Sequence, residues 1–218
     1  MKTSKKILIA LSPIILAILG YLIIFFAARP LISSAASIID MISGGAKEKT
    51  EFNNMYNGNV FKTYTETIPS SEVEFPLPNT QYGEITIEGT DVNCPLIYGD
   101  STAMLKKGAC QYMGSSFPGF GSTLLVSGHN NSYFKSLKDA KLGAIITVKT
   151  TYGEYKYKIV NTAIKQNTDE SAYDLTADKE NVVFYTCYPF DALGLTYQRY
   201  FVYGEYVSGP KIIFEDEE

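Results

Sequence analysis

The fold is decided by the run Val182-Val183-Phe184-Tyr185-Thr186-Cys187, and the rest of the chain is arranged around this run. β-branched and aromatic residues dominate it, which predicts a β-strand that carries a cysteine at its C-terminal end. Pro189 ends this strand, because proline has no amide hydrogen to donate to a neighbouring strand. After a polar loop that contains glycine, the run Gln198–Tyr203 predicts a second strand, which opens on Arg199.

Two residue types are scarce in the chain, and both stand beside predicted strands. His129 is the only histidine, and Arg199 is the only arginine after Arg29. His129 follows the predicted strand Ser122–Ser127, whereas Arg199 opens a strand and Cys187 ends one. We therefore expect Cys187, His129 and Arg199 to form one site. Long-range strand pairing is needed to bring His129 beside Cys187.

Short β-strand signals recur from Glu72 onward, with turn residues between them. Tyr152-Gly153 separates two of these runs, which predicts a hairpin. Only Ser132–Asp139 is predicted to be a short helix, with Ser132 as its cap. About eight such strands predict an all-β sandwich or a closed barrel. The other strands are expected at Glu84–Glu88, Cys94–Tyr98, Ala144–Thr150 and Glu154–Lys165.

The N-terminal residues 7–28 form an uncharged, apolar run. As a helix with a rise of about 1.5 Å per residue, the run is roughly 33 Å long, enough to cross a bilayer core of about 30 Å. The three lysines before it predict a cytoplasmic N-terminus for residues 1–6 and an extracytoplasmic C-terminal domain. A cleaved signal peptide, cut near Ser34-Ala35-Ala36, is the alternative. Its apolar region is usually only about 7–15 residues long, so an uncleaved transmembrane anchor is favoured.

The remaining chain divides by composition into a linker or stalk at residues 29–71, a β-barrel domain at residues 72–208 and an acidic tail at residues 209–218. After the apolar run, the chain carries 16 basic and 23 acidic residues. This balance lacks the basic patch of a nucleic-acid-binding protein and excludes that class of partner. The acids between Asp169 and Glu180 do not have the spacing of a calcium-binding loop, so a solvated loop is favoured.

Two cysteines besides Cys187 leave alternatives open. Cys94 and Cys110 could form a disulfide in an oxidising compartment, or they could be two small buried hydrophobic residues. In either case Cys187 remains the free thiol.

The expected trio of residue types suits covalent chemistry at a carbonyl carbon. An unperturbed cysteine, with a pKa of about 8.5, supplies little of the reactive thiolate at neutral pH. An imidazole can take the thiol proton and return a proton to a leaving amine. An arginine is permanently charged and can donate hydrogen bonds to a developing oxyanion. The alternative is a catalytically silent extracytoplasmic β-module, which binds a partner at the cell wall and keeps Cys187 as packing.

The residues around the cysteine resemble the sortases, the cysteine transpeptidases that attach proteins to the Gram-positive cell wall. Where that family usually has Thr-Leu-x-Thr-Cys, this chain has Val183-Phe184-Tyr185-Thr186-Cys187. The continuation Thr186–Leu193, together with Gln198-Arg199-Tyr200, is similar to class D sortases in particular. The resemblance extends over residues 73–207. Further matches are Phe117-Pro118-Gly119 and Leu124–His129.

The resemblance implies an eight-stranded β-barrel with short helices, in which Cys187 is the nucleophile, His129 the general acid/base and Arg199 the stabiliser of the transition state. It makes Thr186 and Asn130 candidate substrate-binding residues, although relatives often carry arginine at the position of Asn130. No metal or cofactor is expected. The implied partners are proteins with an LPxTG-like sorting signal, which is cleaved after Thr to give a thioester, and an amine of the peptidoglycan precursor. Such an enzyme anchors surface proteins to the cell wall from its place in the cell membrane.

One more motif, Leu77-Pro78-Asn79-Thr80, itself looks like a sorting signal. A proline-rich lead-in to the first strand explains it without a function. Self-occlusion of the site by this segment is the alternative.

Overall fold

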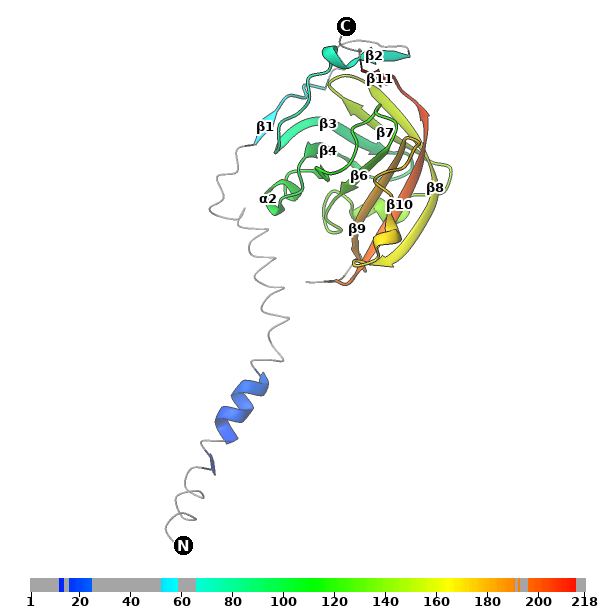
Figure 1. The fold of residues 1–218 in the computed structure, drawn as a ribbon. Helices are drawn as coiled ribbons and strands as arrows, with labels where there is room; N and C mark the ends of the chain where they lie inside the picture. Colours follow the sequence, from blue (N-terminus) through cyan, green and yellow to red (C-terminus); the bar gives the residue numbers. More distant parts are fainter. Residues whose placement is uncertain are drawn as a thin grey trace, which may run out of the picture. The chain divides into compact units, whose positions relative to one another are not determined.

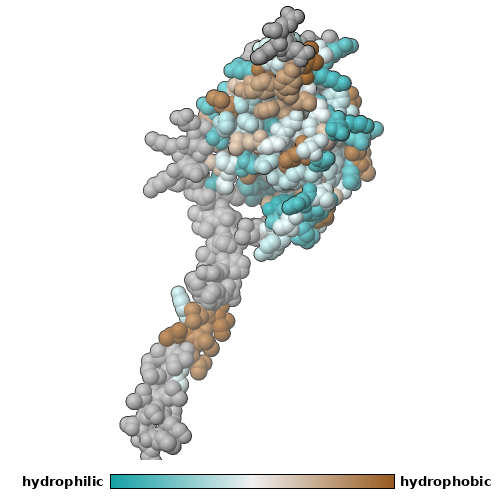
Figure 2. Space-filling model, viewed as in Figure 1, coloured by the Kyte–Doolittle hydropathy of each residue, from teal (hydrophilic) through white to brown (hydrophobic). Residues whose placement is uncertain are grey.

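The computed structural model describes residues 12–13, 16–24, 52–58, 66–190, 192 and 196–214. The chain divides into an N-terminal unit that ends at Ala46 and a second unit that begins at Lys47. In the first unit, residues 16–24 are helical and apolar (Figures 1 and 2). No helix within the described residues is both long and apolar enough to span a membrane. Of the expected anchor, residues 7–28, the segments 7–11, 14–15 and 25–28 lie outside the described residues.

The second unit is a closed, eight-stranded β-barrel, as the sequence predicts (Figure 1). Around the barrel the strands run in the order β3, β4, β5, β6, β9, β10, β8 and β7, and β7 pairs with β3 to close it. The strands are β3 (Thr80–Ile87), β4 (Asn93–Tyr98), β5 (Ala109–Gln111), β6 (Thr123–Ser127), β7 (Ile145–Thr150), β8 (Glu154–Gln166), β9 (Asn181–Tyr188) and β10 (Gln198–Ser208).

The barrel interior is filled by side chains that alternate along the strands, because successive residues of a strand point to opposite faces. In β8, Tyr155, Tyr157 and Ile159 are buried in the main core, whereas the residues between them are exposed. The turn at Tyr152-Gly153 connects β7 to β8 as an antiparallel hairpin, which confirms that prediction.

The described residues of the second unit also contain four short helices: η1 (Ser70–Glu72), α2 (Thr102–Leu105), η2 (Lys135–Asp139) and η3 (Glu170–Ala172). The helix expected at Ser132–Asp139 is η2, which begins later than predicted. The N-cap position of η2 is Phe134, without a side-chain cap, so the prediction that Ser132 caps the helix is wrong. The reason is burial: the Phe134 ring is stacked on Phe184 at 5.5 Å, and its amide donates to the carbonyl oxygen of His129 at 3.0 Å. These contacts hold the chain in a turn before the helix starts.

Among the residues that the structure describes, three short strands lie outside the predicted barrel limits, within the segments predicted as linker (residues 29–71) and tail (residues 209–218). Strand β1 (Asn53–Asn54) pairs with β3, and β2 (Thr67–Pro69) pairs in parallel with β11 (Lys211–Ile213). Ile68 and Ile212 are only 0% and 8% exposed and belong to the main core, which explains why these segments fold onto the barrel. The four acids of the tail lie outside the described residues.

The tetrapeptide Leu77–Thr80 is the turn that leads into β3. Asn79 has a positive φ of 66° and donates its amide to the carbonyl oxygen of Tyr98 at 2.7 Å, while Thr80 is buried at the start of the strand. This supports the lead-in explanation, because Thr80 is already paired within the sheet.

Candidate active site

Strand register brings the three expected residues into one row. The parallel pair β6–β9 aligns Ser127 with Tyr185, and the Gly128 amide donates to the Tyr185 carbonyl oxygen at 3.2 Å. The same register, continued past the end of β6, aligns His129 with Cys187. In the antiparallel pair β9–β10, Cys187 lies directly opposite Arg199. The row therefore crosses three adjacent strands, although it joins residues that are distant in sequence.

The row lies on the outer face of the barrel. Along β9, Val182 and Phe184 belong to the main core, whereas Val183 and Tyr185 belong to a second apolar cluster on the opposite face of the sheet. Cys187 follows the outward alternation. Beneath it the Tyr185 ring stacks on Phe201 at 5.6 Å, so an aromatic floor adjoins the site.

A cleft of about 640 Å³ contains all three residues. Its wall includes Asp100, Leu105 at the end of α2, and the segment from the end of β8 to the start of η3, residues 166–170, with Tyr173. A larger cavity of about 1040 Å³ lies at the opposite ends of β9 and β10, and no histidine or cysteine lines it. The chemistry-bearing side chains therefore converge in the smaller cleft.

Exposure separates Cys187 from the other two cysteines. Cys187 is half-buried, whereas Cys94 and Cys110 are 2% and 0% exposed. Burial raises the pKa of each of these two thiols to about 12, so neither supplies thiolate at neutral pH. They form no disulfide, and they pack into different apolar clusters. The sequence left open whether Cys94 and Cys110 form a disulfide or are small buried residues, and in the structure they are two buried thiols.

The surroundings of the His129 imidazole disfavour its charged form. Its Nε2 atom is buried and has no hydrogen-bond partner among the described residues. Burial, followed by the nearby positive charge of Lys106, lowers the pKa of His129 below its ordinary value. A neutral imidazole with an unused ring nitrogen can accept a proton from a thiol or an amine.

The Arg199 guanidinium is half-buried and fixed by the backbone before it. Its Nη1 donates to the carbonyl oxygens of Thr196 and Gln198, both at 2.8 Å, and to the Thr196 hydroxyl at 3.0 Å. These bonds all start from one nitrogen, and among the described residues no carboxylate forms an ion pair with Arg199. The fork of N–H donors thus keeps capacity for an oxyanion.

The two candidate substrate-binding residues have structural contacts. The buried Thr186 hydroxyl donates to the carbonyl oxygen of Gly128 at 2.7 Å. Gly128 immediately precedes His129 in the sequence, and Thr186 immediately precedes Cys187. The Asn130 amide is 8% exposed and donates to the carbonyl oxygen of Pro189 at 3.0 Å, in the loop after Cys187. Both side chains tie the histidine segment to the cysteine segment. Contact with substrate stays a prediction for each.

Two carboxylates of the acidic loop after β8 accept hydrogen bonds from residues two positions further along the chain. Asp169 accepts from Ser171 and Asp174 accepts from Thr176. Within the described residues, no group of three or more metal-ligating side chains has the arrangement of a metal site. Sequence reasoning missed that this loop is a wall of the cleft, because only the register of β8 against β10 brings it there.

A closed barrel with a thiol, an imidazole and a guanidinium in one outward-facing row defines a class of β-barrel protein with a cysteine-centred site. The family model of the Sortase domain matches residues 85–207, more than half of the chain. The chain belongs to the sortase family.

Known relatives support a class D assignment. Sortase D of Bacillus subtilis is 31% identical over 126 residues, which cover 58% of this chain and 64% of that protein's length. Among solved structures, a Clostridium perfringens Sortase D5 transpeptidase has a TM-score of 0.55 at 18% identity, which shows the fold alone, and covers 61% of this chain and 82% of its own. Sortase A of Listeria monocytogenes has a TM-score of 0.54 at 25% identity and covers 61% and 91%.

Proposed function

We propose that the protein is a membrane-anchored cysteine transpeptidase that cleaves an LPxTG-like sorting signal after Thr and joins the new carboxyl end to an amine of the peptidoglycan precursor. The observation that carries the proposal is the row of His129, Cys187 and Arg199 in one cleft. Membership of the sortase family and the likeness to Sortase D support the same chemistry.

In the first step the His129 imidazole takes the proton of the Cys187 thiol, and the resulting thiolate attacks the carbonyl carbon of the substrate threonine. Arg199 stabilises the oxyanion that develops, because its guanidinium donates hydrogen bonds and carries a fixed charge. The carbon–nitrogen bond to the next residue breaks, and protonated His129 gives its proton to the leaving amine. A thioester between the substrate and Cys187 remains.

In the second step the acceptor amine attacks the thioester carbon. His129 takes a proton from this amine, a new amide bond forms, and the carbon–sulfur bond breaks; the Cys187 sulfur then recovers its proton from His129. Water in place of the amine would complete a hydrolysis.

The proposed place of action is the outer side of the cell membrane. Residues 7–28 are the anchor, the preceding lysines keep residues 1–6 in the cytoplasm, and the barrel lies outside the membrane. Surface proteins that carry sorting signals are the donors, and the cell wall receives them.

The decisive experiment incubates the full chain with a Leu-Pro-x-Thr-Gly peptide, with and without an amine acceptor, and follows thioester and product by mass spectrometry. Cys187→Ala and His129→Ala are expected to abolish cleavage and remain folded. Arg199→Lys is expected to lose about 100-fold or more in kcat, since an ammonium does not reproduce the planar fork. Cys110→Ala is the matched control, because that thiol is buried away from the cleft. Cleavage by Cys187→Ala would refute the proposal.

A thiol reagent separates this function from a silent wall-binding module. We expect iodoacetamide to label Cys187 rapidly and to leave Cys94 and Cys110 unmodified, because burial keeps those two as neutral thiols. Protection of Cys187 in the folded protein would favour the module.

A further inference from the structure

The row of the active site continues onto a fourth strand. Arg199 lies opposite Cys187 on β9 and, on its other side, opposite Lys165 on β8. Like charges that lie directly opposite each other in a sheet repel and destabilise it. The Lys165 ammonium, next to Arg199, therefore needs an anionic partner.

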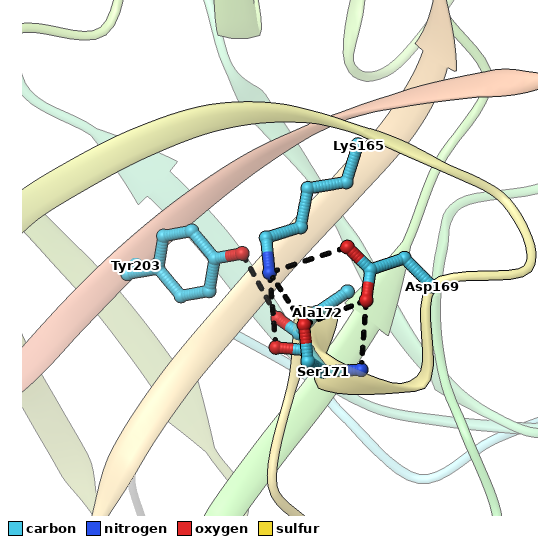
Figure 3. A network of polar contacts seen from close by, with 5 residues as sticks. All are labelled: Lys165, Asp169, Ser171, Ala172 and Tyr203. Carbon is cyan, nitrogen blue, oxygen red and sulfur yellow. Dashed lines mark hydrogen bonds and ion pairs between the residues drawn. The ribbon is translucent and has the colours of Figure 1, made fainter.

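That partner is Asp169 (Figure 3). It lies in the loop that lines the cleft. The Lys165 ammonium lies 3.5 Å from Asp169 Oδ2 and donates to the carbonyl oxygen and the hydroxyl of Ser171 at 3.0 and 3.2 Å. Asp169 Oδ1 in turn accepts from the Ser171 amide at 2.9 Å and the Ser171 hydroxyl at 2.6 Å. The hydrogen bonds from Ser171, with the charge of Lys165, hold the pKa of Asp169 below its ordinary value, so it stays ionised.

The same carboxylate shares its cleft with Arg199. Asp169 and Arg199 line one cleft, and the Asn167 amide donates to the carbonyl oxygen of Tyr197 at 2.8 Å, next to the segment that holds the guanidinium. An arginine and a carboxylate readily form a bidentate pair. Such a pair would occupy the donors that the oxyanion needs.

We propose that Lys165 is a positioning residue for Arg199: it retains Asp169 in the wall of the cleft and so keeps the Arg199 guanidinium available for the oxyanion. The inference rests on the proposed function of Arg199 and adds a role that involves neither the thiol nor the imidazole. Lys165 acts by holding a competing anion.

The test is a double-mutant cycle in the full chain, read out as kcat and KM for transfer of the sorting peptide to an amine. Lys165→Gln releases Asp169, and we expect kcat to fall about tenfold or more with KM nearly constant, since the loss lies in oxyanion stabilisation. Asp169→Asn keeps an oxygen for Ser171 but removes the competing charge, so it should lose far less. Lys165→Gln combined with Asp169→Asn should recover most of the lost kcat, and Lys165→Arg should retain it. Lys156→Gln is the matched control, because Lys156 also lies on β8 and pairs with Glu154 at 3.4 Å.

Labelling of arginine by phenylglyoxal supplies a readout that needs no turnover. Arg199 and Arg29 are the only arginines, so Arg29 serves as the internal reference. Lys165→Gln should slow the labelling of Arg199, and the added Asp169→Asn should restore it. A double variant that stays as impaired as Lys165→Gln, with unchanged labelling, would show that the lysine only braces the wall and overturn the inference. If the Lys165 and Asp169 variants show the expected labelling but Arg199→Lys is fully active, the proposed role of Arg199 in the reaction is refuted instead.

Discussion

Replacing Thr186 by valine should uncouple the histidine segment from the cysteine segment. The Thr186 side chain is 1% exposed, and its hydroxyl donates to the Gly128 carbonyl oxygen at 2.7 Å. This hydrogen bond joins the residue before Cys187 to the residue before His129. Valine keeps the shape and removes the donor. The lost hydrogen bond and the buried carbonyl left without its donor, partly offset by the added methyl group, amount to about 2 kcal/mol.

This free energy should appear as a lower midpoint in urea, by roughly 1 M for an m-value of about 2 kcal/mol/M. Turnover per folded molecule should fall about tenfold or more, because small displacements of reacting groups are costly. Thr186→Ser is the matched control: it keeps the hydroxyl, loses about 0.8 kcal/mol with its methyl group and should retain turnover within about threefold. Equal turnover of the two variants, measured per folded molecule, would refute the reasoning. A rise in KM alone would point to substrate contact.

Two further predictions concern the imidazole and the small sheet of β2 and β11. The NMR titration of His129, the only histidine, should have its midpoint below about 6.5, and Lys106→Gln should raise it. Since this pKa is lower in the folded than in the unfolded chain, the stability it contributes is present above about pH 6.5 and is lost as the pH falls through the folded pKa; a midpoint at or above the ordinary value would contradict the burial argument. Ile212→Ala should cost about 2–4 kcal/mol of unfolding free energy because Ile212 packs in the core. The control Ile213→Ala, at a side chain 46% exposed, should cost well under half as much in the same denaturant titration, and equal losses would show that β11 is not anchored through Ile212.

Local patterns were enough to predict most of the barrel. The run Val182–Cys187 and the alternation in Glu154–Lys165 follow from side-chain chemistry and a period of two, and both lie within strands of the structure. Strands β2 and β11 could not be predicted, because each is three residues long and pairs with a segment far away in the chain. Their sequences become strands only against the barrel.

The candidate site could be predicted by residue type but not by arrangement. The scarcity of histidine and arginine singled out His129 and Arg199, and the structure lines one cleft with both and Cys187. The role of Asn130 was inaccessible, because its partner carbonyls lie in the loop after Cys187. Lys165 gave no signal either: it ends a predicted strand like any solvated lysine, and only the pairing of β8 with β10 sets it beside Arg199.

The outward orientation of the reactive row frees it from the packing of the interior. Interior side chains such as Tyr157 and Phe184 pack the core of the barrel, whereas loops on its outer face line the cleft. We therefore expect a longer segment in place of residues 166–170 to change what can reach the thiol while the packing of the barrel core is kept. In such an architecture, new specificities can arise by lengthening appendages on an unchanged frame.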